Sequence, residues 1–303
     1  MAEQPLSILV AGASGFIGTP LVRALREAGH HVTTLVRREP HTATEFRWSP
    51  GSRPLDPAIV DGADVVINLA GANIGKLPWT ETYKREIEQS RVDATDTLVE
   101  AMRHAATPPA LFLSGSASGV YGDRPSDVLQ DEAAPGTGFL AEVCTVWEAA
   151  ANRAPEGVRV VTLRTGIVVG KGGGALAPHV PLTKAGLGSR LGTGGQHWPW
   201  IALEDEVGAI VHLATSPSAS RVSGPVNLAG PEPAVADRLT KRVAEDLHRP
   251  YLFRLPEFAL RLVLRDAADE MLLSSQQMVP TKLLESGFAF RYTRAEDAVD
   301  AAF

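Results

Sequence analysis

The sequence is poor in cysteine and contains no long apolar run. Cys144 is the single cysteine among 303 residues, so no intrachain disulfide can form, and we expect a cytoplasmic protein. No charged segment followed by an apolar stretch precedes the first predicted strand, so we expect no secretory signal. The apolar stretch FALRLVLRD is interrupted by arginine and falls short of the roughly 18 to 20 residues that span a bilayer. We therefore expect no membrane insertion.

Clustered positive charge is also lacking. Lysine and arginine number 29 against 35 acidic residues, which gives a net charge of -6 and a pI near 5.8. Binding to a phosphate backbone requires concentrated positive charge, so we expect no nucleic-acid partner. The eight histidines show no HxxxH or Cys/His spacing, and we expect no metal site.

What the first half does contain is a regular alternation of short apolar runs with longer helical patterns. The predicted strands are 7–12, 31–37, 64–71, 110–116 and 159–170, and the predicted helices are 20–29, 79–104 and 139–153. The strands are apolar almost throughout, which is typical of a parallel sheet covered by helices on both faces. The sequence predicts an α/β fold with a Rossmann-like, doubly wound parallel sheet.

The composition and the pattern of predicted elements change after Gly170. The chain becomes glycine-rich and irregular, returns to one helix and one strand at about 205–230, and ends in helical segments. We expect residues 1–170, with about 205–230 returning to the sheet, to form a cofactor domain. Residues 171–204 and 231–303 are expected to form a smaller substrate lobe.

Three glycines directly follow the first predicted strand, in the stretch GASGFIG. Gly12 permits a tight turn, Gly15 permits backbone to approach a pyrophosphate, and Gly18 permits the next helix to lie close to the sheet. The N-terminus of that helix supplies free N–H groups and partial positive charge. We interpret the turn, with Ser14, Phe16 and Ile17, as a dinucleotide site; the alternative is a plain strand-to-helix junction.

Two arginines end the second predicted strand. A fold that binds NAD carries an acid near this position for the ribose 2′-hydroxyl, whereas this chain has Arg37 and Arg38. Guanidinium groups make charge-assisted hydrogen bonds to a 2′-phosphate, which favours NADP over NAD. The alternative is that both arginines only solvate a loop.

Several motifs together resemble a known family. GxxGxxG, VVINLAG at 65–71 and LSGSASGVYGD at 113–123 resemble the extended and atypical short-chain dehydrogenase/reductase superfamily. NLAGANI, WTETYKREIEQSR, GFLAEVCTVWEAAA, LRTGIVVGKGGGAL, WPWI and MVPTKLLESGFAFRY resemble its epimerase-like subfamily, represented in humans by short-chain dehydrogenase/reductase family 39U member 1. This resemblance implies NADP binding on a Rossmann core, an epimerase/dehydratase-type protein, and a family-specific C-terminal domain at about 250–300.

The resemblance also assigns cofactor contacts. It places Leu69 and Ala70 beside the adenine and ribose, counts the adjoining Gly71 among the cofactor contacts, and places Val168 beside the nicotinamide carboxamide. It further implies cofactor contacts for Glu86 and Arg91. From the residues alone, Glu86 and Arg91 are better interpreted as solvated side chains on a helix face, and Val168 is equally an ordinary valine at a strand end.

The catalytic pair of the superfamily is missing. Its members use a Ser or Thr after the fifth strand, which Ser116 matches, and a YxxxK motif on the next helix. Counting back from Glu148, the tyrosine position holds Leu140 and the lysine position Cys144, and no Tyr or Lys occurs from 136 to 164.

Three interpretations of this absence remain open. Tyr121, Glu142 or Ser116 replaces the proton donor; an already activated substrate needs no acid; or the protein binds NADP as a sensor without turnover. Cys144 more closely matches a buried small hydrophobe than a nucleophile. We therefore predict an NADP-dependent oxidoreductase or epimerase-like protein acting on an unidentified small molecule, with Ser116 and Tyr121 as catalytic candidates.

Other signals are weaker. GKGGGAL at 170–176 lacks the GK[ST] ending of a phosphate loop, so we interpret it as a flexible loop on the substrate side. Trp198 and Trp200 either line a substrate cleft or anchor the second lobe. The sequence leaves open whether the protein is a monomer or a homodimer.

Overall fold

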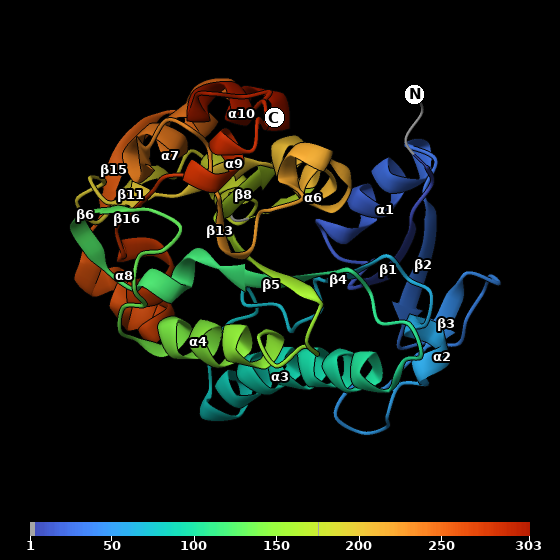
Figure 1. The fold of residues 1–303 in the computed structure, drawn as a ribbon. Coiled ribbons are helices and arrows are strands. Elements are labelled where there is room, and N and C mark those ends of the chain that lie inside the picture. The colour runs from blue at the N-terminus through green and yellow to red at the C-terminus, as the bar shows by residue number, and fades with distance from the viewer. Residues whose placement is uncertain (1–3, 175) are drawn as a thin grey trace.

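A seven-stranded parallel sheet forms the centre of the molecule (Figure 1). The computed structural model describes residues 4–174 and 176–303. The strands lie in the order β13-β7-β5-β4-β1-β2-β3. Their bounds are β1 (Ser7–Ala11), β2 (His31–Val36), β3 (Glu45–Arg47), β4 (Val65–Asn68), β5 (Leu111–Ala117), β7 (Arg159–Thr165) and β13 (Gly224–Leu228). The order reverses between β1 and β4, so the predicted Rossmann-like, doubly wound sheet is confirmed.

Helices cover both faces of this sheet. In Figure 1, α3 (Glu81–His104) and α4 (Phe139–Ala151) lie below it, and α1 (Gly18–Glu27) and α6 (Leu203–Thr215) lie above it. A short helix, α2 (Pro57–Val60), precedes β4. The predicted helix 79–104 begins two residues later, where the Thr80 side chain accepts a hydrogen bond from the Tyr83 amide. β1, β4 and most of β5 are buried because helices pack on both faces.

The apolar run 159–170, predicted as one strand, forms two. β7 ends at Thr165, and β8 (Ile167–Gly170) pairs instead with β12 (Trp200–Ala202) and β9 (Gly173–Gly174) in a separate three-stranded sheet. The break is at Gly166, where a Cβ would overlap the carbonyl oxygen of Pro199. The Ile167 amide donates to that same carbonyl at 2.6 Å. Backbone contact with a distant segment therefore ends β7.

The remaining elements form a second region. Three two-stranded sheets pair β10 (Gly188–Leu191) with β15 (Tyr251–Leu255), β11 (His197–Trp198) with β14 (Ala234–Val235), and β16 (Gln276–Met278) with β6 (Arg124–Leu129). Its helices are α5 (His179–Lys184), α7 (Ala236–Asp246), α8 (Glu257–Leu264) and α10 (Ala295–Ala302), and a π-helical turn covers Ala268–Leu273. α9 (Thr281–Glu285) instead packs against β13 and the core of the central sheet. Two 3-10 turns, Ser118–Tyr121 and Pro217–Ala219, complete the described elements. The limits of the two predicted domains stay a prediction.

A buried carboxylate joins the C-terminal segment to the first region. Asp205, in the first turn of α6, accepts hydrogen bonds from the backbone amides of Arg291 at 2.7 Å and Tyr292 at 3.0 Å. These bonds satisfy two amides of the C-terminal segment ahead of α10.

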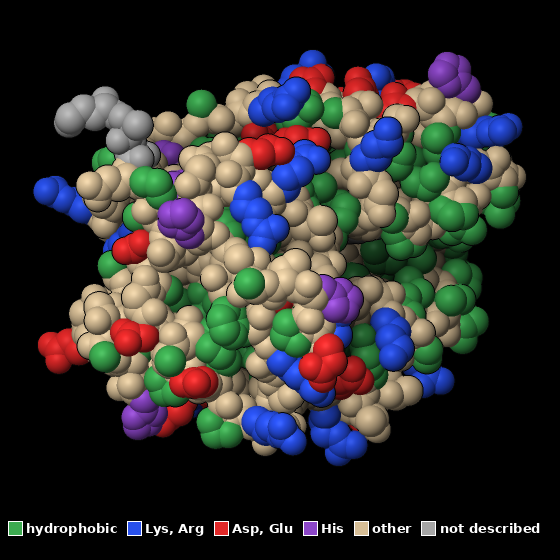
Figure 2. Space-filling model, turned by 90° about the vertical axis from the view of Figure 1, so that its right-hand side faces the viewer, with side chains coloured by type: hydrophobic (Ala, Val, Ile, Leu, Met, Phe, Trp, Pro, Cys, Tyr) green, Lys and Arg blue, Asp and Glu red, His purple; other side chains and the backbone are tan. Residues whose placement is uncertain are grey.

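Charge of both signs is spread over the face seen from the right-hand side of Figure 1. On it, Lys and Arg side chains lie among Asp and Glu (Figure 2). This face is hollowed toward its right-hand edge, where hydrophobic side chains gather. Within residues 4–174 and 176–303, no helix is both long and apolar enough to cross a membrane.

Candidate functional site

The glycine turn after β1 rests directly on the end of β4. Gly12 has a φ of +83°, and a Cβ there would lie 2.6 Å from the carbonyl carbon and oxygen of Leu69. At Gly18 a Cβ would overlap the Gly12 carbonyl oxygen, to which the Gly15 amide donates at 3.0 Å. Only glycine fits at positions 12 and 18. The turn is thereby held against Leu69 and Ala70, the residues that the resemblance places beside the adenine and ribose.

Two positions in the first turn of α1 offer no free backbone donor, because the Thr19 amide donates to the Gly15 carbonyl at 3.0 Å and Pro20 has no amide hydrogen. No side chain caps the helix at Ile17, and its first turn contains no acidic residue. Ser14 and Gly15 are exposed beside it. Free N–H groups and the helix dipole at such an end attract an anionic group.

Phe16 lies under the glycine-rich segment that follows β8. A Cβ at Gly173 would lie 2.6 Å from its ring, and Cβ atoms at Gly170 and Gly174 would lie 3.3 and 3.2 Å from it. Within the stretch 170–176, predicted to be a flexible loop on the substrate side, residues 170–174 form a tight strand turn packed on the glycine turn, and residue 175 lies outside the described residues. Its glycines let the backbone approach the Phe16 ring.

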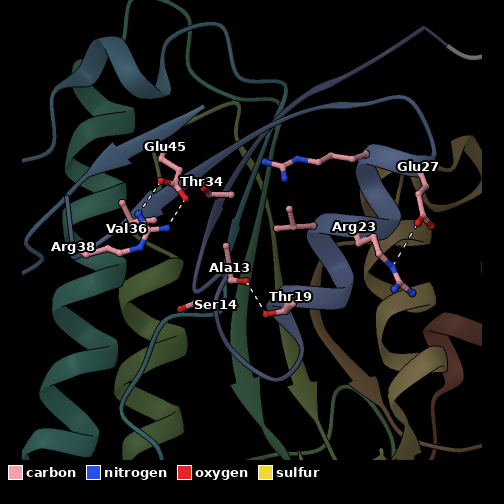
Figure 3. Close-up of a pocket in the computed structure, with 11 residues that line it drawn as sticks. Ala13, Ser14, Thr19, Arg23, Glu27, Thr34, Val36, Arg38 and Glu45 are labelled. Carbon is pink, nitrogen blue, oxygen red and sulfur yellow. Dashed lines mark hydrogen bonds and ion pairs between the residues drawn. The ribbon is translucent and has the colours of Figure 1, made fainter. Parts of the chain in front are cut away.

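A pocket of about 520 Å³ opens between α1 and β2, next to the glycine turn (Figure 3). Ala13 and Ser14 form the side nearest the turn, and Arg38 enters from the end of β2. Arg38 donates to both carboxylate oxygens of Glu45, at 2.6 and 2.9 Å. Arg37 is exposed and does not line this pocket.

The end of β4 is fixed by a chain of buried hydrogen bonds. The Ala70 amide donates to Asn68, Asn68 donates to the Thr95 hydroxyl at 3.0 Å, and Trp147 donates to the same hydroxyl at 3.0 Å. α3 and α4 thus jointly position the turn at Leu69 and Ala70.

Arg91 lies beside this turn, and Glu86 is exposed on the same helix, α3. The Arg91 guanidinium donates to the Ile87 carbonyl at 2.8 Å and stacks 5.2 Å from the Trp147 ring. A Cβ at Gly71 would lie 3.1 Å from its side chain. Burial lowers the pKa of Arg91. Burial raises the pKa of Tyr83 on the same helix, and Glu86 adds to this rise whereas Arg91 opposes it. The cofactor contact of Glu86 stays a prediction.

The two positions where the superfamily carries Tyr and Lys are buried. Leu140 is 8% exposed and Cys144 2%, both on α4. Burial raises the pKa of the Cys144 thiol to about 11, so the thiol stays protonated at neutral pH. Its sulfur lies 3.8 Å from the Ala117 carbonyl oxygen.

Ser116, at the end of β5, is bound to a buried ion pair. Its hydroxyl donates to Glu148 Oε1 at 2.6 Å. Arg164 donates to both oxygens of Glu148, at 2.8 and 2.9 Å. Because both Glu148 oxygens accept from Arg164 and one of them also accepts from Ser116, the Ser116 proton is directed to that carboxylate. With its proton donated to Glu148, the Ser116 oxygen can only accept further hydrogen bonds.

Tyr121 lies on the far side of the same ion pair and is fully buried. Its hydroxyl donates to Asn227 Oδ1 at 2.7 Å and accepts from Arg164 at 3.0 Å. Burial raises its pKa. The structure does not present Tyr121 to a substrate, because burial and these bonds occupy its hydroxyl. Glu142, the third candidate, is exposed on α4 and outside this network.

Both tryptophans of WPWI belong to the core of the second region. Trp198 is 3% exposed and donates to the Leu272 carbonyl at 3.2 Å; Trp200 is 1% exposed and donates to the Glu232 carbonyl at 2.9 Å. Val168, on β8, is 9% exposed and pairs with Ile201. Of the two interpretations of the tryptophans, this packing favours anchoring.

Sequence reasoning missed several polar residues of this site. From the sequence, Glu148 served only as the reference from which the Tyr and Lys positions were counted. Arg164 and Glu45 were not considered as site residues. A charged residue inside the apolar strand VVTLRTG is a signal for Arg164, since a buried charge needs a partner. Glu45 carries no such signal. Across the described ranges, 4–174 and 176–303, no group of three His, Cys, Asp or Glu residues could hold a metal ion.

Comparisons with known proteins agree with this geometry. Residues 8–229 match the NAD dependent epimerase/dehydratase family, and 255–302 match a domain of unknown function, DUF1731. An epimerase family protein of Mycobacterium bovis, Mb2239, is 39% identical over 97% of each chain. The human epimerase family protein SDR39U1 is 32% identical over 95% of this chain and 96% of its own. The crystal structure of human SDR39U1 (isoform 2) with NADPH superposes with a TM-score of 0.87, at 28% identity, over 97% of this chain and 98% of that one.

Proposed function

The chain belongs to the NAD dependent epimerase/dehydratase family, and we propose that it binds NADP and acts on a small molecule as an atypical short-chain dehydrogenase/reductase. Membership supports a nicotinamide dinucleotide as the cofactor. The observation that carries the proposal is the glycine turn: positions 12 and 18 exclude any side chain, and α1 begins there without a cap. A dinucleotide pyrophosphate fits a turn built this way.

The preference for NADP rests on the basic residues at the end of β2. Arg38 lines the pocket beside Ser14, and Arg37 is exposed next to it. Human SDR39U1, which shares the fold at a TM-score of 0.87, was crystallised with NADPH. Two guanidinium groups beside the adenosine ribose favour the phosphorylated cofactor.

We assign the other cofactor contacts to residues around the end of β4. Leu69, Ala70 and Gly71 form the turn that adjoins Gly12, and Arg91 lies against Gly71 with a backbone carbonyl as its hydrogen-bond acceptor. Val168 extends the site from β8. When bound, the nicotinamide supplies hydride transfer, and these residues bind and orient the dinucleotide.

Ser116 is our candidate for orienting the substrate. Its proton is directed to Glu148, so Ser116 accepts a hydrogen bond from a substrate hydroxyl or amine rather than donating one. Arg164 fixes Glu148 and so fixes the Ser116 rotamer. Leu140 has no proton to transfer and the buried Cys144 thiol retains its own, so we expect slow turnover of generic aldehydes, ketones and nucleotide-sugars.

A second candidate function is NADP sensing without turnover. The observation that favours it is the packing of the two positions normally used for acid catalysis: both are apolar and buried. A broad metabolite screen followed by NADPH absorbance separates the two candidates. A substrate whose turnover is lost in Ser116→Ala and kept in Tyr121→Phe supports an enzyme, whereas tight NADPH binding with no turnover supports the sensor.

The cofactor assignment is tested by titrating the protein with NADPH and NADH. Replacing Arg37 and Arg38 with alanine removes charge-assisted contacts worth about 1.5 to 3 kcal/mol each, so NADPH affinity should fall by well over tenfold. Arg47→Ala is the matched control, since Arg47 lies on the neighbouring strand β3 and pairs with Glu39 outside the pocket. Unchanged NADPH affinity in the double variant would place the phosphate elsewhere.

A further inference from the structure

The arginine that we assign to the 2′-phosphate, Arg38, is already hydrogen-bonded to an acidic side chain, Glu45. Glu45 lines the pocket beside Ala13 and Ser14, and its side chain is 14% exposed (Figure 3). Each of its two carboxylate oxygens accepts from one terminal nitrogen of Arg38, at 2.6 and 2.9 Å. The guanidinium fork of Arg38 is thus used by a carboxylate from the next strand.

Backbone structure holds Glu45 in this place. It begins β3, where it is the register partner of Thr34 on β2, and the His41 amide donates to its Oε2 at 2.6 Å. Arg38 and the His41 amide lower the pKa of Glu45 to about 2. The carboxylate is therefore charged at any pH at which the protein is folded and active.

The other two basic side chains that line the pocket, Arg23 and Arg26, lie on α1 and have other partners. Arg23 pairs with Glu27 one helical turn away, at 3.5 Å, and Arg26 donates to the Val32 carbonyl at 3.4 Å. Arg38 is the basic lining residue at the strand end, on the side of the glycine turn where the ribose would lie. A phosphate arriving there meets an arginine that is already paired.

We propose that Glu45 sets the preference between NADP and NAD by competing with the 2′-phosphate for Arg38. This inference rests on the proposed function, because it requires the dinucleotide to bind along the glycine turn. Glu45 holds the edge formed by the two terminal nitrogens of Arg38, so the phosphate must either displace the carboxylate or bind the remaining Nε edge, and in both cases it lies beside a negative charge. NAD, with a neutral 2′-hydroxyl, leaves the pair intact. Glu45 accordingly weakens NADP binding and leaves NAD binding nearly unchanged.

Glu45→Gln tests the inference because it removes the charge and keeps the shape. Calorimetric titration of the full chain with NADPH and with NADH should show NADPH binding tightened by about tenfold, the size of one charge-assisted hydrogen bond. NADH affinity should stay within about twofold, since it has no phosphate to be repelled. NADH binding to the same variant also reports that the variant is folded.

Two further variants identify the cause. Glu39→Gln, on the same loop but outside the pocket, should leave both affinities unchanged. In an Arg38→Ala background, Glu45→Gln should lose the part of its effect that comes from releasing the guanidinium and keep only the part that comes from removing charge repulsion. An unchanged ratio of NADPH to NADH affinity in folded Glu45→Gln overturns the inference and leaves the proposed function standing. Failure of the wild-type protein to bind either nucleotide overturns both.

Discussion

At the scale of single residues, the polar side chains around Ser116 are hydrogen-bonded to one another. Glu148 receives hydrogen bonds from Ser116 and Arg164, and Arg164 in turn donates to Tyr121. Removing one member of a buried ion pair leaves an uncompensated charge, so Glu148 and Arg164 act first on the structure and through it on Ser116. This separates Ser116, a candidate substrate contact, from the residues that position it.

The reactivity of Cys144 tests how far solvent and reagents reach the buried face of α4. Burial raises its pKa to about 11 and leaves the side chain 2% exposed, so the thiolate needed for alkylation is scarce and sheltered. We expect the native protein to resist iodoacetamide at pH 8 and to react fully after denaturation, as measured by mass spectrometry. Rapid labelling of native protein would show that α4 opens at this position.

At the scale of elements, the glycine turn joins β1, α1 and the end of β4. Gly12 and Gly29 both have positive φ, at +83° and +89°. They differ in their surroundings: a Cβ at Gly12 would meet Leu69 backbone at 2.6 Å, whereas nothing lies within 4 Å of a Cβ at Gly29. The pair therefore separates the cost of the dihedral angle from the cost of the contact.

Gly29→Ala should lower the free energy of unfolding by about 1 kcal/mol, the cost of a left-handed non-glycine residue. Gly12→Ala should lower it by more and should also abolish NADPH binding, because the turn must move away from Leu69. Chemical denaturation and nucleotide titration of both variants measure this. Equal destabilisation with intact binding in Gly12→Ala would contradict the close contact.

At the scale of the whole molecule, Glu206 makes stability depend on pH. It lies on α6, is fully buried, and has one described hydrogen bond, from the Thr165 hydroxyl at 2.9 Å. Burial raises its pKa from 4.5 to about 8. The folded state therefore keeps a proton that the unfolded chain releases above pH 4.5, so this group favours folding less and less as pH rises toward 8.

Glu206→Gln removes this dependence. Between pH 5 and 8 the wild-type protein should lose stability relative to the variant, by at most about 1.4 kcal/mol per pH unit, and the difference should level off above pH 8. Thermal unfolding of both proteins across this range gives the comparison. Parallel curves would mean that the carboxyl is ionised and paired in the folded state.

The sequence alone determined the central sheet, the glycine turn, the family and the absence of the usual Tyr and Lys. These depend on local periodicity and spacing, which a linear chain displays directly. β3 was not predicted, because its three residues, Glu45–Arg47, are half or fully exposed and form no apolar run. The site residues proposed from the resemblance stay predictions, although the structure brings Gly12, Leu69, Ala70 and Arg91 close to one another.

Tertiary structure alone decided which polar groups meet. Ser116 and Glu148 are 32 residues apart, and Thr165 and Glu206 are 41 apart. Parallel strands require long crossovers, so residues at one edge of the sheet come from distant parts of the chain, and spacing does not reveal their pairing. Even the short-range pair Arg38 and Glu45 depends on the register of β2 against β3. A carboxylate seven residues after an arginine becomes its partner only once those strands align.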